Sequence, residues 1–257
     1  MLLFVTDYRA KKCTISYIAC NKYEQRPKFY EMIKTQNIVR IFYTGEVAKT
    51  ALSNININIK KGEYVSLSGP SGCGKSTLLS ILGLIDKQTS GELFFLDINI
   101  SKKKEHQRAK LRRGNIGYVF KDPFLLDELT VFENIELPLF YMRYKRKERI
   151  DIIENALLKY KMIHLKNKYP IQLNEEQQQM TAILRATVTN PSLLIADEPT
   201  GRLDSKERDN ILKTFSTLNE EGMTIILATH SPYISDQTPR TIRMFDGHVV
   251  TDNNITL

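Results

Sequence analysis

The sequence predicts an α/β fold in which a mostly parallel β-sheet is flanked by helices. Short apolar runs with strand character alternate with segments of helical period, and a long helical stretch over about residues 125–190 interrupts this alternation. Strands that alternate with helices pair in parallel through right-handed crossovers. We therefore expect a parallel sheet with an antiparallel β part at its N-terminal end and an inserted helical subdomain.

The length and composition indicate one large globular domain with room for an insertion. The chain has 257 residues, of which 42% are hydrophobic and 26% charged. No apolar run approaches the roughly 20 residues of a membrane helix, and the opening MLLFV is too short for a signal sequence. The three cysteines favour a reducing cytosol over a disulfide framework. The net charge of +8 does not by itself select a partner.

The expected elements begin at Met32, because residues 1–31 have little clear period. We interpret residues 1–31 as an N-terminal extension or a start assigned too early. Before the helical block we expect a β-like run at 33–44, an alternating Ile/Asn strand at 53–59, a strand at 64–68, a helix from Lys75 to near Gly83, and strands within 91–100 and 115–120. Inside the block, Thr130 and Glu133 form a capping box at a helix start.

The α/β pattern resumes after the helical block. We expect a strand at 192–198, a helix from about Ser205 to Glu220, a strand at 223–230 and a hairpin over 241–252 that turns at Asp246-Gly247. The domain is predicted to span residues 32–250, which leaves 251–257 as a tail.

A glycine-rich run between a strand and a helix is typical of phosphate binding. GPSGCGKST, Gly69–Thr77, matches the P-loop pattern, with Gly69, Gly74, Lys75 and Ser76 at its defining positions. Backbone amides and the helix N-terminus attract phosphate, Lys75 is expected on the β- and γ-phosphates, and the Ser76 hydroxyl is expected to bind Mg²⁺. The run thus predicts a P-loop that binds a nucleotide; the other loop residues expected to contact the nucleotide are Ser71, Gly72, Cys73 and Thr77. The alternative is a glycine-rich turn without a ligand.

Two acidic residues and a histidine follow strands that we expect in the same sheet. Asp197 and Glu198 end the apolar run LLIADE, and His230 ends MTIILATH. Strand ends of this kind meet at one edge of an α/β sheet. We therefore predict that Asp197 holds Mg²⁺, that Glu198 polarises the attacking water and that His230 contacts the γ-phosphate, with Glu198 and His230 as catalytic residues. The alternatives are a surface acidic pair and a structural histidine.

In their order along the chain, these motifs resemble those of the ATP-binding cassette (ABC) ATPases. GPSGCGKST, LLIADEPTGRLDS and TIILATH are similar to the Walker A motif, the Walker B motif with its D-loop, and the H-loop. IGYVFKDPFLLDELTVFENIELPL and LNEEQQQM resemble the Q-loop region and the signature helix of the macrolide-export and lipoprotein-release branch (MacB and LolD type). The resemblance covers about residues 32–250.

The resemblance implies an ATP-binding subunit that couples MgATP binding and hydrolysis to a separate membrane permease. Two cassettes, as a homodimer or a heterodimer, pair head to tail, so that each ATP lies between the Walker motifs of one and the signature of the other. Phe42, or its neighbour Tyr43, falls where the family stacks an aromatic ring on adenine, and Asp204 falls at the D-loop acid that acts across the dimer. The permease docks near the Q-loop and the helical block. The resemblance places the protein in the cytoplasm, peripheral on the inner face of the cell membrane, and implies no nucleic-acid partner.

The chain departs from the family pattern at two motifs. Lys121 stands where the family has the Q-loop glutamine, and LNEEQ stands where it has LSGGQ, so that Glu175 and Glu176 replace both glycines. A carboxylate about 5 Å from a phosphate charge repels it by about 3 kcal/mol at an effective dielectric near 20. We therefore predict an ABC-type ATPase with weakened hydrolysis, unless Lys121 of the paired cassette partly neutralises the glutamates. The alternatives are a non-hydrolytic ATP-binding regulatory subunit, a degenerate half of a heterodimeric ATPase, and a cassette ATPase that acts on nucleic acid or the ribosome.

Overall fold

In the computed structural model, residues 31–45 and 47–254 are described. The predicted extension, residues 1–31, lies outside the described residues except for Glu31, where the first strand begins. At the other end, the last strand reaches Asn254, so it includes the first part of the predicted tail. No helix within 31–45 and 47–254 is long and apolar enough to cross a membrane.

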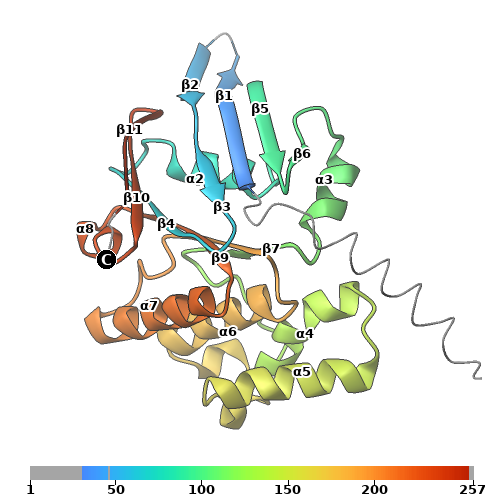
Figure 1. The fold of residues 1–257 in the computed structure, drawn as a ribbon. Coiled ribbons are helices and arrows are strands. Elements are labelled where there is room, and N and C mark those ends of the chain that lie inside the picture. The colour runs from blue at the N-terminus through green and yellow to red at the C-terminus, as the bar shows by residue number, and fades with distance from the viewer. Residues whose placement is uncertain (1–30, 46, 255–257) are drawn as a thin grey trace, which may run out of the picture. The chain divides into compact units, whose positions relative to one another are not determined.

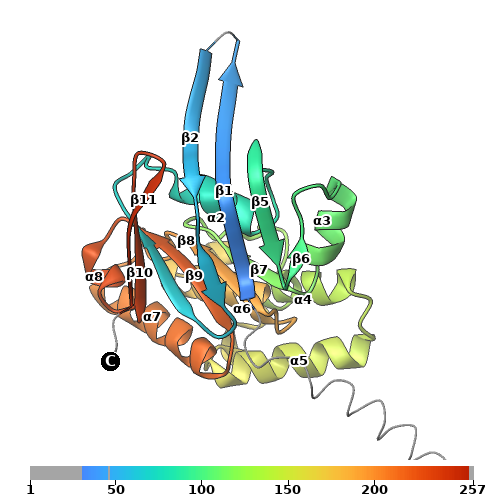
Figure 2. The same ribbon diagram turned by 45° about the horizontal axis from the view of Figure 1, so that its top comes forward.

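Two β-sheets form the frame of the domain (Figures 1 and 2). The antiparallel sheet has the order β2-β1-β5-β6, with β3 also paired to β1, and consists of β1 (Glu31–Thr44), β2 (Val47–Ile55), β3 (Asn58–Lys60), β5 (Ser90–Phe95) and β6 (Ile98–Asn99). The second sheet has the order β11-β10-β4-β9-β8-β7 and consists of β4 (Tyr64–Ser68), β7 (Ile116–Val119), β8 (Leu193–Asp197), β9 (Thr224–Thr229), β10 (Arg240–Phe245) and β11 (His248–Asn254). All of its neighbours pair in parallel except the hairpin β10-β11. This arrangement confirms the predicted fold class.

The alternating Ile/Asn run is divided between two strands rather than forming one. β2 ends at Ile55 and β3 begins at Asn58. Ile55, Ile57 and Ile59 are all buried, while the asparagines between them are exposed. The period of two is therefore kept, but the chain bends because Asn54 has a left-handed backbone, with φ of 52°.

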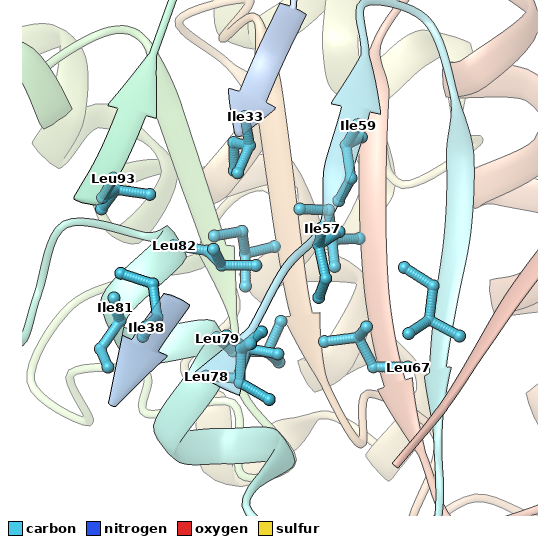
Figure 3. Packing of buried hydrophobic residues seen from close by; sticks show 14 of the residues in the cluster. Ile33, Ile38, Ile57, Ile59, Leu67, Leu78, Leu79, Ile81, Leu82 and Leu93 are labelled. Carbon is cyan, nitrogen blue, oxygen red and sulfur yellow. The ribbon is translucent and has the colours of Figure 1, made fainter. Parts of the chain in front are cut away.

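The helices lie on both sides of the six-stranded sheet. α2 (Lys75–Leu82) lies between the two sheets, where its leucines and isoleucine join a core drawn from both (Figure 3). On the opposite face, α6 (Glu175–Thr187) and α7 (Ser205–Glu220) cover β8 and β9 (Figure 1). The shorter helices are α3 (Glu105–Arg112) and α8 (Pro232–Ser235).

The inserted helical subdomain has a hydrophobic cluster of its own. It contains α4 (Val131–Tyr141), α5 (Arg146–Lys159), two 3₁₀ turns (Ile163–Leu165 and Pro170–Gln172) and the start of α6. Ile135, Ile153 and Leu157 are fully buried between α4 and α5. Thr130 caps α4 and exchanges hydrogen bonds with Glu133, which confirms the predicted capping box.

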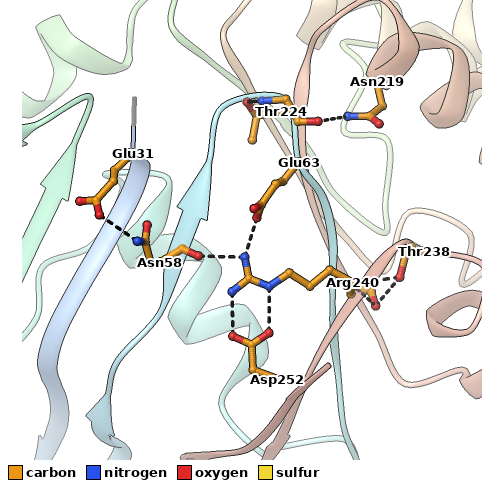
Figure 4. A network of polar contacts seen from close by, with 10 residues as sticks. Glu31, Asn58, Glu63, Asn219, Thr224, Thr238, Arg240 and Asp252 are labelled. Carbon is orange, nitrogen blue, oxygen red and sulfur yellow. Dashed lines mark hydrogen bonds and ion pairs between the residues drawn. The ribbon is translucent and has the colours of Figure 1, made fainter. Parts of the chain in front are cut away.

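Arg240 joins the C-terminal hairpin to the antiparallel part of the domain (Figure 4). Its Nε and Nη2 donate to Asp252 at 2.8 and 2.7 Å, and its Nη1 donates to Glu63 at 2.5 Å and to the Asn58 carbonyl at 2.8 Å. The hydrogen bond to Asp252 raises the pKa of the Arg240 guanidinium. Arg240 begins β10, at the edge opposite to the carboxyl end of β4, so this network stabilises the frame at a distance from the glycine loop.

Candidate nucleotide-binding site

The loop between β4 and α2 needs glycine at specific positions. Gly74 immediately precedes α2 with φ of +103°, and a Cβ there would lie 2.7 Å from the Ala51 carbonyl oxygen and 2.9 Å from Leu52 Cδ2. No other side chain is compatible with both the conformation and the contact. Among the described residues, no side chain caps the start of α2, so its first amides are available to bind an anion.

Lys75 is held inside this loop by backbone oxygens. Its Nζ donates to the carbonyls of Gly69 at 2.8 Å and Pro70 at 3.0 Å, and the residue is 6% exposed. Within the part of the chain that the structure describes, no carboxylate forms an ion pair with it. A buried ammonium whose partners carry no negative charge is stabilised by an approaching phosphate. The Cys73 thiol, predicted to contact nucleotide, is buried and lies 3.9 Å from Lys75 Nζ.

Asp197 and Ser76 have the geometry expected of Mg²⁺ ligands. Asp197 ends β8, and its Oδ1 is buried with no hydrogen-bond partner among the described residues. Burial raises the pKa of the Asp197 carboxyl, and a hydrogen bond with Ser76 opposes that shift. A buried carboxylate oxygen without a partner, beside a serine hydroxyl, provides the hard oxygen ligands that Mg²⁺ prefers. These two residues therefore fit the metal.

We expect Asp197→Asn to stabilise the ligand-free protein while abolishing its response to MgATP. Because burial raises the folded-state pKa above the unfolded value, the ionised carboxylate destabilises the fold increasingly as pH rises through that window. At neutral pH, Asn should raise Tm, and the gain should disappear as the pH falls to the ordinary aspartate pKa of about 4. Thermal melts with and without MgATP measure both effects. Asp209→Asn, on the exposed side of α7, is the control, and an unchanged or lower Tm for Asp197→Asn would contradict the account.

Glu198 and His230 form a pair at the same edge of the sheet. Glu198 Oε1 lies 2.8 Å from His230 Nδ1, and its backbone amide donates to the Ala228 carbonyl at 3.0 Å. Glu198 adopts a left-handed backbone, with φ of 49°, which is uncommon for a residue with a side chain. Its side chain is 19% exposed and that of His230 is 60% exposed. A carboxylate held by an imidazole at the mouth of a cavity is suited to orient and deprotonate a water.

The groups described so far surround one cavity of about 850 Å³. The predicted residues that line it are Phe42, Ser71, Gly72, Gly74, Lys75, Ser76, Thr77, Glu198 and His230. Gly69, Cys73 and Asp197, also predicted, are not part of this lining. Phe42 is 40% exposed under the guanidinium of Arg40, whereas Tyr43 is 69% exposed and is not part of the lining.

Sequence reasoning missed several residues that line the same cavity. These are Lys49, Thr50 and Ala51 from β2, Pro70 from the loop, and Asp246 and Gly247 from the β10-β11 turn. The turn reaches the loop because the Gly247 amide donates to the Cys73 carbonyl at 3.1 Å. The sequence predicts a turn at Asp246-Gly247, but nothing in it indicates that the turn lies against the P-loop.

The acidic helix start LNEEQ is well formed in the structure. Asn174 Oδ1 accepts from the Gln177 amide at 2.8 Å, and Gln177 Oε1 accepts from the Asn174 amide at 3.1 Å, so these two residues form a capping box at the start of α6. Glu175 pairs with Arg202 of the loop before α7 at 3.0 Å. Asn210 of α7 donates to Glu176 at 2.8 Å. Asp204 caps α7 by accepting from the amides of residues 206 and 207.

Lys121, the residue in place of the Q-loop glutamine, lines the 850 Å³ cavity together with Lys75 and Glu198. It also borders a small cavity that Glu175 and Arg202 line. The structure thus places Lys121 beside both the phosphate loop and the acidic helix start, and Arg202, which sequence reasoning did not single out, is the cation that pairs with Glu175.

A strand, a glycine loop and a helix that hold a buried lysine beside a paired glutamate and histidine define a P-loop nucleotide-binding protein. The ABC transporter family model matches residues 52–201, more than half of the chain. The chain therefore belongs to the ABC transporter family, whose ATP-binding cassettes bind and hydrolyse ATP.

Known relatives support this assignment. The chain is 41% identical over 223 residues to an uncharacterised ABC transporter ATP-binding protein of Methanocaldococcus jannaschii, MJ1508, covering 85% of this chain and 98% of that protein. A dimeric structure of the cassette MJ0796 from the same organism, bound to ADP and phosphate, has a TM-score of 0.82 at 37% identity, covering 88% of this chain and 100% of that one. The macrolide export ATP-binding/permease protein MacB of Pasteurella multocida is 37% identical over 225 residues, covering 88% of this chain and 35% of MacB. The chain is thus an ABC transporter ATP-binding subunit.

Proposed function

We propose that this chain couples the binding and slow hydrolysis of MgATP to a separate membrane permease. The observation that carries the proposal is the single cavity in which Lys75, Ser76, Glu198 and His230 meet. Lys75 binds the β- and γ-phosphates, Phe42 stacks on adenine, and Ser76 and Asp197 hold Mg²⁺. The metal, when bound, neutralises charge on the phosphates.

Hydrolysis relies on the Glu198–His230 pair. Glu198 orients the attacking water and accepts its proton. His230 fixes the glutamate carboxylate through the 2.8 Å contact and presents its exposed ring toward the γ-phosphate. The presence of this pair favours a working ATPase over a purely regulatory ATP-binding subunit.

The acidic start of α6 slows the reaction at the dimer interface. In a head-to-tail pair this helix start faces the γ-phosphate of the partner, where amides and the helix dipole favour an anion. Glu175 and Glu176 occupy that anion site with their own charge. Arg202 offsets Glu175, whereas Asn210 is neutral and leaves the charge of Glu176 in place. In a pair of two copies of this chain, hydrolysis is therefore weakened at both sites. In a pair with another cassette subunit that has LSGGQ, Glu198 and His230 face an intact signature, and only the partner's site is weakened.

The permease docks at a second, mostly apolar cavity of about 470 Å³. Its lining comes from the ends of α3 and α4 and from β7 and α6, and includes Ile85, Tyr118, Phe120, Pro138, Tyr141 and Met142. Residues 102–113 contain seven basic and one acidic residue, and residues 143–149 contain five and one. Gly114 and Met142 bring these segments together, since a Cβ on Gly114 would lie 2.8 Å from Met142 Cε. Such a basic rim suits the anionic lipid at the inner face of the cell membrane.

A charge placed in this cavity should uncouple the chain from its permease. Tyr141 lines the cavity and is 68% exposed, so Tyr141→Glu places a carboxylate against the docked segment without disturbing the core. We expect the variant to lose co-purification with the permease while it retains MgATP binding. Leu158→Glu on α5, 56% exposed and outside the cavity lining, is the matched control. Equal co-purification of both variants would contradict this docking site.

The proposed function is tested by MgATP affinity and turnover of the purified chain, alone and co-expressed with a candidate permease subunit. We expect binding in both preparations and slow turnover that rises with the permease. Binding without turnover in either preparation would establish the regulatory alternative. Absence of MgATP binding would refute both.

A further inference from the structure

Arg202 ties together three segments that are far apart in the sequence. Its Nη2 contacts Glu175 Oε1 at 3.0 Å, at the start of α6, and its Nη1 contacts Asp122 Oδ1 at 3.2 Å, in the loop after β7. Arg202 itself lies in the loop between β8 and α7. The hydrogen bond to Glu175 is the main reason that the pKa of the Arg202 guanidinium is raised. An arginine is charged at every physiological pH, so Glu175 always has a counter-charge within its own chain.

The loop that holds Asp122 is already fixed to α6 at two other points. Gln179 donates to the Phe120 carbonyl at 3.0 Å, and Arg185 donates to the carbonyls of Pro123 at 2.7 Å and Phe124 at 2.8 Å. Residues 120–124 and α6 are therefore one connected unit. Arg202 joins this unit to the loop that follows the catalytic glutamate, and it does so at the acidic end of the helix.

We propose that Arg202 is the built-in counter-charge of the acidic signature and thereby permits two ATP-bound cassettes to pair. The inference rests on the proposed function, because the start of α6 must face a phosphate for its charge to matter. Without Arg202, both carboxylates of α6 and the carboxylate of Asp122 oppose the incoming nucleotide. With Arg202 in place, Glu175, Asp122 and the guanidinium together carry one negative charge instead of two.

The two glutamates are therefore not equivalent. Glu176 accepts a hydrogen bond from Asn210, which carries no charge, whereas Glu175 is paired with a cation. Each substitution removes one carboxylate, but Glu175→Gln also removes the contact that holds Arg202 at the start of α6 and leaves the guanidinium with Asp122. We therefore expect Glu176→Gln to strengthen ATP-driven association about tenfold and Glu175→Gln to strengthen it clearly less. Equal effects of the two substitutions would contradict the inference.

A double-mutant cycle between Arg202 and Glu175 provides the decisive test. In the full-length chain with MgATP, self-association of Arg202→Ala should be about tenfold weaker than that of the wild type. The loss should largely disappear when Glu175→Gln is also present, and it should diminish in high salt because the effect is electrostatic. Arg208→Ala in α7 controls for the lost positive charge and should have little effect, because the guanidinium of Arg208 lies over the ring of Tyr233 in α8.

Each outcome of the cycle decides the inference. The same loss with and without Glu175→Gln would show that Arg202 acts structurally and would overturn it. Stronger association of Arg202→Ala would show that the Arg202 contacts inhibit pairing, and this too would overturn it. If MgATP drives no association of any variant, both the inference and the proposed function are wrong. If MgATP drives association to the same extent with and without Arg202, only the inference is wrong.

Discussion

Replacing both Glu175 and Glu176 by glycine should raise the ATP turnover of this chain by about 10- to 100-fold. Each carboxylate, at about 5 Å from a phosphate charge, costs about 3 kcal/mol at an effective dielectric near 20. Arg202 and Glu175 are 41% and 48% exposed, so solvent screens much of this repulsion and the expected gain is smaller than the Coulomb sum for two removed charges. Glycine also exposes the first amides of α6 to the γ-phosphate of the paired cassette. Steady-state phosphate release measures the change.

The matched control is a second pair of adjacent glutamates, Glu220 and Glu221, at the C-terminal end of α7. Their replacement by glycine removes the same charge and should leave turnover unchanged. Adding Lys121→Gln to the variant with glycine at residues 175 and 176 should raise turnover further. Lys121 borders the nucleotide cavity, and the substitution restores the glutamine that the family has in its Q-loop. If turnover rises in neither the double nor the triple variant, the acidic helix start is not what limits hydrolysis.

Glu198→Gln should reduce turnover by about 10²- to 10⁴-fold while MgATP affinity stays within a fewfold of the wild type. The amide keeps the size of the side chain and its contact with His230, but it cannot accept a proton from water. Lys75, Ser76 and the glycine loop still hold the phosphates. Single-turnover hydrolysis and equilibrium binding separate the two effects.

The control for this prediction is Glu92→Gln, a glutamate of β5 whose side chain accepts from Asn99 away from the nucleotide cavity. It should preserve both affinity and turnover. Hydrolysis at the wild-type rate in Glu198→Gln would mean that another group activates the water. Loss of affinity would mean that Glu198 serves mainly to hold the nucleotide.

The elements with strong local signals could be predicted from the sequence. β4 has the predicted bounds because its apolar run leads directly into the glycine loop. α7 has the predicted bounds because Asp204 caps a segment with a clear helical period. The capping pairs Thr130/Glu133 and Asn174/Gln177 act over three residues, so their residue types suffice to predict them.

The elements without an apolar stripe could not be predicted in this way. Arg108 is the only buried residue of α3, and it is held by the Asp86 carbonyl at 2.6 Å and by Glu105. This helix depends on contacts with a distant part of the chain rather than on a hydrophobic period. The strand predicted from residue 53 divides after Ile55, where the left-handed backbone of Asn54 coincides with a shift in the register between β2 and β1.

The predicted site is incomplete because some of its contacts join residues that are far apart in the sequence. The glycine loop and the acids after β8 have motifs, and the structure brings most of them to one cavity. Arg202 pairs with residues 27 and 80 positions away, and no local pattern reports such contacts. The sequence suggests two glutamates without a counter-charge. In the structure Glu175 has the cation Arg202 beside it, whereas Glu176 has only the neutral Asn210.

The most direct test of the account is the association state of the Glu198→Gln protein saturated with MgATP, compared with the same protein carrying glycine at residues 175 and 176. Sedimentation velocity at micromolar protein measures both. We predict that nucleotide binds to both proteins, that the first stays mainly monomeric, and that the second forms a stable dimer. Dimers of equal stability would contradict the claim that the acidic helix start of α6 restrains the ATP-bound pair.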